Sequence, residues 1–170
     1  NCAVAGYTIT DSHTGGGNWG GTGLGGLVGI SNMNLSGCSA VTHIVLSSND
    51  NDNVRVGGLV GTSQGSISSS YTGGSIQVKN AQVGKERGIY IGGICGGIYM
   101  KPLTVDSNTT IGKNGNLQNE IKNCYTYVEL PAAGSNRFIK GLYAVGGSGE
   151  LNLQGTNDGN ADHGWSNYDN

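Results

Sequence analysis

Charged and aromatic residues are scarce in this chain, and the scarcity limits the functions open to it. Asp, Glu, Lys and Arg make up 12% of the 170 residues, and Phe, Trp and Tyr make up 6%. The charged share is about half of what globular domains usually carry. A net charge of −2 is too neutral for a nucleic-acid partner, which needs clustered Lys and Arg. No apolar run approaches the roughly 18 residues of a membrane span. We therefore expect no nucleic-acid binding and no membrane span.

Glycine, by contrast, is abundant and recurs in a motif. The 33 glycines include three copies of a glycine pair followed by two apolar residues and a further glycine, at 25–29, 57–61 and 92–96. A weaker copy lies at 143–147, and its glycine pair, Gly146-Gly147, is the expected equivalent of Gly92-Gly93. Cys38 follows the first glycine of its copy at the same interval at which Ser70 follows Gly57. The third copy reaches its equivalent, Cys124, much later than this interval predicts, which indicates an insertion at about 99–117. The chain is predicted to contain about four repeats of 32–36 residues.

Alternating residues after each Cys or Ser position predict strands. The rows that begin at Cys38, Ser70 and Cys124 place small residues first and a branched aliphatic residue six positions later, at the period of a strand. We expect these rows to face the interior, with small side chains where it is narrow, and His43 to point to solvent. A glycine pair in a strand marks a bend or a close backbone approach, so the pairs are predicted to be corners.

Strands without helices, repeated at this period, predict an all-β fold. We expect a β-solenoid, similar to a β-helix, in which each repeat is roughly one coil. The solenoid is expected to span residues 1–149, including the insertion, and residues 150–170 to form a C-terminal tail or cap. Residue 1 falls inside a repeat, so we expect a longer or processed chain. Open solenoid ends invite neighbouring domains or copies of the same chain.

The best copy of the repeat has a recognisable sequence. Residues 56–74 read Val-Gly-Gly-Leu-Val-Gly-Thr-Ser-Gln-Gly-Ser-Ile-Ser-Ser-Ser-Tyr-Thr-Gly-Gly. This copy resembles the GLUG-motif repeat of bacterial surface and secreted proteins, and the resemblance extends over residues 1–149. That family occurs in adhesin-like proteins and in non-catalytic regions of secreted peptidases, including immunoglobulin A peptidases. The resemblance implies an extracellular or cell-surface location and offers no catalytic residues.

The four cysteines raise the question of disulfides in an extracellular chain. Cys2, Cys38 and Cys124 occupy one repeat position, and Cys95 occupies a position that is Val in the first two copies. We expect all four to be reduced core residues that replace Ser or Val. The alternative is a single disulfide between Cys2 and Cys38, because adjacent coils place them near the required Cα separation.

Candidate binding residues lie outside the regular repeats. Asp158, Asn160 and Asp162 alternate oxygen side chains as in the first half of a calcium loop. They are the candidate metal ligands, although the later Gly and Glu of such a loop are missing, and calcium is the one candidate cofactor. Trp19 and Trp165 lie in Asn/Gly-rich loops, where an aromatic face and amide donors could meet a glycan. The alternative for these two residues is that they cap the ends of the solenoid.

Catalytic constellations are missing from the sequence. The three histidines lie in different repeat contexts and none belongs to His-Glu-x-x-His, while Asp50 and Asp52 belong to an Asn/Asp run that we expect to be a solvated loop. We therefore predict that the chain is not an enzyme. It is expected to be a non-catalytic extracellular structural or adhesive segment of a larger bacterial surface protein. Its partner would be a host or cell-surface glycan or protein.

Two alternatives stay open at this point. One is an accessory, substrate-positioning domain of a secreted peptidase or glycan-degrading enzyme, and the other is a free-standing β-helical enzyme. In each case, specificity is expected where the chain departs from the repeat: at 13–23, at 99–117 and from Glu150 onward. Insertions in repeat proteins gather on one face and often carry the binding surface.

Overall fold

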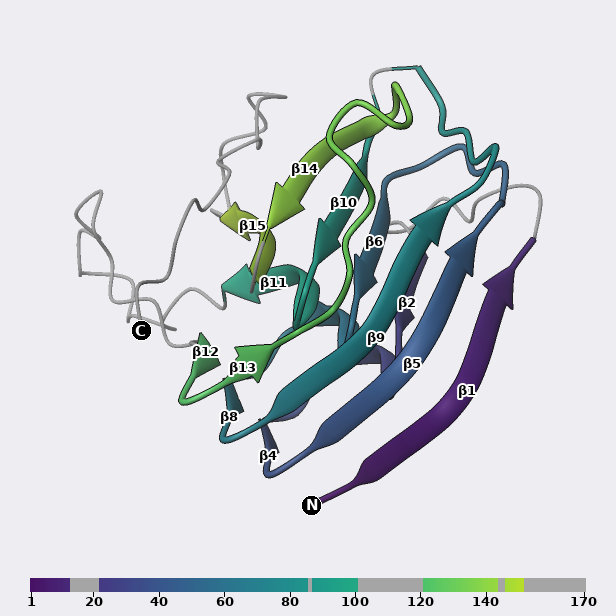
Figure 1. The fold of residues 1–170 in the computed structure, drawn as a ribbon. Helices are drawn as coiled ribbons and strands as arrows, with labels where there is room; N and C mark the ends of the chain where they lie inside the picture. Colours follow the sequence, from purple (N-terminus) through teal and green to yellow (C-terminus); the bar gives the residue numbers. More distant parts are fainter. Residues whose placement is uncertain (13–21, 86, 101–120, 144–145, 152–170) are drawn as a thin grey trace, which may run out of the picture.

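The computed structural model describes residues 1–12, 22–85, 87–100, 121–143 and 146–151. These ranges contain fifteen strands and no helix, so they also contain no helix that could cross a membrane. Strands that neighbour each other in a sheet run parallel, and successive turns of the chain stack on one another (Figure 1). The predicted all-β β-solenoid is confirmed.

Four parallel sheets line the coils, and neighbouring strands of a sheet come from successive coils. The long sheet contains, in spatial order, β1 (Ala3–Asp11), β5 (Ser39–Leu46), β9 (Tyr71–Val78) and β13 (Tyr125–Thr126). The return sheet contains β14 (Ile139–Tyr143), β10 (Ile89–Gly92), β6 (Val54–Gly57) and β2 (Thr22–Gly25). The side sheet contains β15 (Gly146–Leu151), β11 (Cys95–Met100), β7 (Val60–Ser63) and β3 (Val28–Ser31). The short sheet contains β12 (Ile121–Lys122), β8 (Ile67–Ser68) and β4 (Leu35–Ser36).

The strand register confirms the repeat and the size of its insertion. Gly25 pairs with Gly57, and Gly57 pairs with Gly92, as the motif predicts. In the long sheet Thr72 pairs with Thr126, and these two are further apart in the sequence than Gly57 and Gly92. The excess equals the length of the insertion expected at 99–117. Because β11 runs to Met100, the first two residues of that range are still strand. Residues 101–120 lie outside the described part of the chain.

The fourth copy of the motif is out of the predicted register. Gly146 was expected to be the equivalent of Gly92, but Gly92 pairs with Tyr143, and Gly146 pairs with Cys95. The glycine pair at 146–147 therefore belongs to β15, beyond the corner position. The expectation for this copy was wrong because a glycine motif does not by itself determine the strand register. Pairing with the preceding coil determines it.

The glycine pairs lie at the corners between return and side strands, as predicted. A Cβ on Gly57 would collide with the carbonyl oxygen of Val60 in the same coil and lie 2.7 Å from the nitrogen of Gly96 in the next. A Cβ on Gly58 would lie 3.0 Å from the Cβ of Thr72 in the long sheet. The corner thus approaches the opposite wall so closely that only glycine fits.

The narrowing at the corner divides the interior into two apolar clusters. One cluster is formed by the following buried residues: Cys38, Ala40, Leu59, Val60, Ile67, Ile94, Cys95, Ile98, Ile121 and Cys124. The other is formed by Ile44, Leu46, Val54, Val56, Ile76, Ala81, Val83, Ile89 and Ile91. In β5 the predicted inward row is buried in full, while His43 is exposed, which confirms the prediction for both. Thr72, at the narrow point, donates a 2.7 Å hydrogen bond from Oγ1 to the Gly93 carbonyl.

Candidate functional site

The residues selected from sequence as binding candidates lie outside the described part of the chain. This holds for the calcium candidates Asp158, Asn160 and Asp162 and for the glycan candidates Trp19 and Trp165. Among the described residues, no group of three or more His, Cys, Asp or Glu side chains could hold a metal ion. The described surface therefore has to be searched for sites on the coils themselves.

The Asn/Asp run after β5 is a structural turn, and the expectation of a solvated loop was wrong for Asp50. Asp50 is 4% exposed; its carboxylate accepts hydrogen bonds from Thr22 Oγ1 and, at 3.1 Å, from the backbone N–H of Asp52. The Asp52 carboxylate lies 3.5 Å from the Arg87 guanidinium. The backbone N–H of Gly88 donates a 2.9 Å bond to Asn53 Oδ1. A buried carboxylate needs hydrogen-bond donors around it, and here some of the donors come from neighbouring coils. These polar contacts therefore connect the turns of successive coils.

The four cysteines are free thiols. Cys38, Cys95 and Cys124 are buried, but Cys2 is exposed, so the expectation of a core residue was wrong for Cys2. The reason is that β1 is an edge strand of the long sheet, which leaves its inward face less covered. Burial raises the pKa of the Cys95 thiol to about 12, and burial also raises the pKa of Cys124. These two thiols are therefore neutral and poor nucleophiles at pH 7.

Three tyrosines gather on the outer face of the long sheet. Tyr71 pairs with Tyr125, and their rings stack with centroids 5.1 Å apart and planes 6° from parallel. Further along the same segment, Tyr127 lies beside Gly73, where a Cβ would collide with the Tyr127 ring atoms. The Tyr127 ring therefore covers the glycine. Tyr125 is 59% exposed and Tyr127 58%. We call Tyr71, Tyr125 and Tyr127 the aromatic face.

Polar side chains continue the same surface along the strands. His43 Nδ1 and Ser75 Oγ lie 2.9 Å apart in a hydrogen bond. The backbone of Ser75 forms a parallel β-bridge with Glu129 in the next coil. Both His43 and Glu129 are exposed. The outer face of the long sheet thus presents aromatic rings next to an imidazole and a carboxylate, all on a rigid hydrogen-bonded support.

Sequence reasoning missed the aromatic face although a signal was present. Tyr71 and Tyr125 each directly follow the Cys/Ser position, so they are in the outward phase of the predicted strands. Applying the period of two to the outward row would have placed both on solvent-facing positions one coil apart. The same alignment places Tyr127 beside Gly73, but the lie of its ring over the glycine depends on the side-chain conformation, which the sequence does not show.

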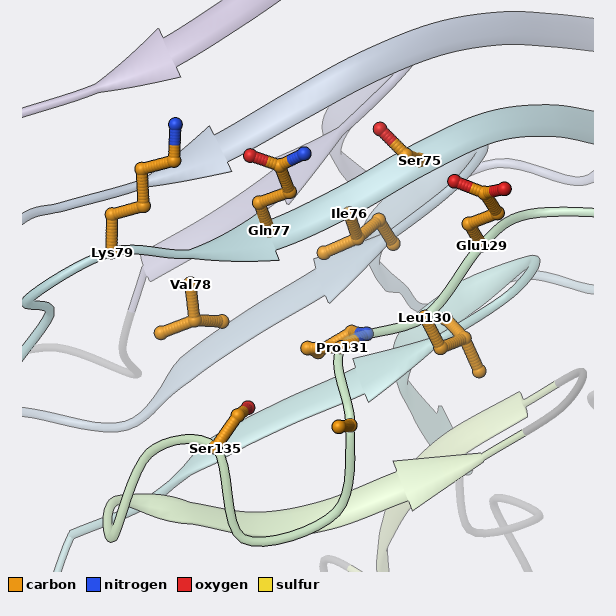
Figure 2. A pocket seen from close by; sticks show the side chains of 10 residues that line it. Ser75, Ile76, Gln77, Val78, Lys79, Glu129, Leu130, Pro131 and Ser135 are labelled. Atoms are coloured by element: carbon orange, nitrogen blue, oxygen red, sulfur yellow. The ribbon is translucent and has the colours of Figure 1, made fainter.

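A groove opens at the edge of the long sheet where the segment after β13 separates from β9 (Figure 2). Its volume is about 340 Å³. One wall is the second half of β9, residues 75–78, together with Lys79 after it, and the other is the segment 129–135. In Figure 2 Val78, Pro131 and Leu130 lie along the floor, while Gln77 and Lys79 project on the outer side.

The segment after β13 stops pairing with β9 because its next hydrogen-bonding position is a proline. The backbone N–H groups of Tyr125, Tyr127 and Glu129 donate to the carbonyls of Ser70, Thr72 and Gly74 at 3.1, 3.0 and 2.9 Å. The next donor in this series would be residue 131, which is Pro131 and has no N–H. Pairing with β9 ends there, and the groove begins.

Comparison of the chain with protein-family models, curated proteins and solved structures finds no match.

Proposed function

We propose that this chain is a non-catalytic, extracellular repeat segment that binds a cell-surface glycan with the aromatic face of its long sheet. The observation that carries the proposal is the ring of Tyr127, which lies over Gly73 and remains 58% exposed. A large apolar ring held on a rigid sheet and left open to solvent suits the apolar face of a pyranose. The stacked pair Tyr71 and Tyr125 fixes one side of that surface.

Polar groups beside the aromatic face supply the hydrogen bonds that a sugar requires. Glu129 is exposed, and its carboxylate can accept hydrogen bonds from sugar hydroxyls. His43 is held by Ser75 in the neighbouring strand. Binding sites for small polar ligands combine apolar contact area with a few placed polar groups of this kind. Because the first half of β9 is already hydrogen-bonded to β5 and to the segment 125–129, little conformational entropy is lost when a ligand binds.

The resemblance of residues 56–74 to the GLUG-motif repeat supports an adhesive role on a bacterial surface. The composition of the repeats agrees with it, since Gly, Ser, Thr, Val and Ile build the coil and leave specificity to the exposed aromatic and charged side chains. Further binding residues are proposed in the insertion, and Asp158, Asn160 and Asp162 stay the candidate calcium ligands.

Glycan-array screening followed by calorimetry with the best neutral oligosaccharide tests the proposal. Tyr127→Ala should weaken binding by at least about tenfold, the loss expected for an aromatic anchor. Tyr7→Ala is the matched control, because Tyr7 is 63% exposed but belongs to β1; its affinity should stay within about twofold of the unchanged protein. Gly73→Ala keeps the tyrosine and displaces its ring, so it should weaken binding as well.

The unfolding midpoints of the three variants show whether each remains folded. Absence of glycan binding by the unchanged chain would overturn the proposal. Equal binding by the unchanged chain and by a folded Tyr127→Ala variant would also overturn it.

A further inference from the structure

The groove beside β9 contains an unfinished strand edge. In β9, Ile76 donates its N–H to Glu129 at 2.8 Å on the groove side, whereas Lys79 donates to Leu46 of β5 at 2.7 Å on the other side. Because the direction of backbone groups alternates along a strand, the N–H and carbonyl of Val78 point to the same side as those of Ile76. That side is the groove, where Pro131 has ended the pairing.

The groove has a defined length. At one end the Ser75–Glu129 bridge closes it. At the other end Asn136 Nδ2 donates a 2.9 Å hydrogen bond to the Ala81 carbonyl and fastens the loop to the coil again. In between, a turn closed by the bond from Ser135 N–H to the Ala132 carbonyl, at 3.0 Å, carries the chain away from β9. The exposed edge Ile76–Lys79 is roughly 13 Å long, at about 3.3 Å per residue, which accommodates a peptide of three or four residues.

The side chains around this edge define what would occupy it. Val78 is half-buried and lies with Leu130 and Pro131 on the floor of the groove, so an inward-facing residue of an added strand would meet an apolar surface. Lys79 and Gln77 are exposed on the outer side. Glu129 stands at the opposite end from Lys79, so the two ends of the edge have opposite charge.

We propose that this groove binds an extended peptide segment of a partner protein, which adds to the long sheet as a short parallel strand. Its backbone would exchange hydrogen bonds with Val78, as in other cases of strand addition to an open sheet edge. An aliphatic side chain would face inward over Val78, and a carboxylate would follow it on the outer side and pair with Lys79. In the parallel direction that carboxylate lies at the C-terminal end of the bound segment. It is supplied by the outward-facing acidic side chain of the residue that follows the aliphatic one.

This inference goes beyond the glycan proposal, and the two surfaces meet at Ser75 and Glu129, which none of the proposed variants changes. The aromatic face lies on the flat outer side of the long sheet, whereas the peptide would bind along the sheet's edge. Tyr127→Ala should therefore leave peptide affinity unchanged, within about twofold. Failure of either proposal can be recognised independently of the other.

The probe is a fluorescein-labelled peptide, Gly-Gly-Val-Thr-Val-Asp, titrated with the full chain by fluorescence anisotropy. We expect saturable binding. Methylation of the backbone nitrogen of its Asp, the residue after the valine opposite Val78, removes the strand hydrogen bond to the Val78 carbonyl and should weaken binding by at least about tenfold. Lys79→Glu should weaken binding to a similar extent, because it places a carboxylate against a carboxylate. Lys85→Glu is the matched control, since Lys85 is exposed but lies outside the groove, and it should bind as the unchanged protein does.

A charge exchange separates a specific pair from a general electrostatic effect. A peptide with Lys in place of its last Asp should bind the Lys79→Glu variant more tightly than it binds the unchanged protein. Amidation of the peptide terminus leaves the Asp side chain as its last carboxylate. Retained binding supports the proposal, and lost binding would overturn it.

Three further results would overturn the proposal. The first is absence of binding at peptide concentrations up to about 1 mM, the weakest range of specific association. The second is equal affinity of the N-methylated and unmodified peptides. The third is a dimer of the unchanged chain, seen by light scattering, that Lys79→Glu converts to a monomer, because the edge would then be occupied by a second copy.

Discussion

Leu59 is the residue whose truncation tests the solenoid interior most directly. It belongs to the corner between β6 and β7, it is 0% exposed, and it packs in the cluster that contains Ile67 and Ile94. Its backbone also joins three coils, since its carbonyl accepts hydrogen bonds from Leu27 and Val28 at 2.9 and 3.1 Å, and its N–H donates to Ile94 at 2.9 Å. Truncation to alanine keeps the backbone bonds and removes only side-chain packing.

The magnitude follows from the atoms removed and the rigidity of the site. Leu59→Ala deletes three carbon atoms from a fully buried position, at about 0.8 kcal/mol of transfer free energy each. A cavity term is added, because corner glycines hold neighbouring coils in place and prevent collapse; together they give a loss of about 3 to 5 kcal/mol in the free energy of unfolding. The melting temperature should fall by roughly 6 to 20 °C for a chain of this size.

Leu27→Ala provides the matched control for Leu59→Ala. Leu27 occupies the same corner one coil earlier, but it is only half-buried because its coil contains the edge strands β2 and β3. Its truncation should cost about 1 to 2 kcal/mol. Denaturant unfolding of both variants, with unchanged dependence on denaturant concentration, measures the difference. Equal losses at the two positions, or an unchanged midpoint for Leu59→Ala, would refute the description of the corner as a buried layer between coils.

Two further predictions concern the corner and the buried thiol. Gly57→Ala should destabilise the chain by about 1 to 3 kcal/mol, because its Cβ would collide with the Val60 carbonyl; an unchanged unfolding midpoint would contradict this. Burial raises the pKa of Cys95 from 9.0 to about 12. The contribution of its neutral thiol to the free energy of unfolding is therefore complete below pH 9 and decreases as the pH rises toward 12. Cys95→Val, the residue at position 60, should reduce this decrease in pH-dependent unfolding; an identical pH profile would contradict the burial argument.

The sequence alone was enough to predict the period of the coils, the strands and the inward rows. Each of these depends on spacing within the chain: Gly25, Gly57 and Gly92 mark the corners, and Cys38 and Ser70 mark the first residues of inward rows. Alternation within a strand is fixed by backbone geometry, so the burial of Ile44 and the exposure of His43 could be read without knowing which strands are neighbours.

Tertiary structure decided the features that depend on the neighbouring coil. In a solenoid, every side chain meets residues one repeat away, which are distant along the sequence, as Thr72 and Thr126 are. Whether a residue is covered depends on that distant partner, which explains why Cys2 is exposed while Cys38 is buried, and why Asp50 is enclosed by a hydroxyl from the coil before it.

Both proposed binding surfaces depend on the same relation between coils. Tyr127 covers Gly73 because the two belong to adjacent coils, and the groove exists because Pro131 reaches the point where the carbonyl of Ile76 needs a donor. The sequence contains the tyrosine, the glycine and the proline. The repeat spacing places each of them beside its neighbour, but only the stacked coils show that the ring covers the glycine and that the groove opens at the proline, because side-chain positions and the course of a loop depend on three-dimensional packing.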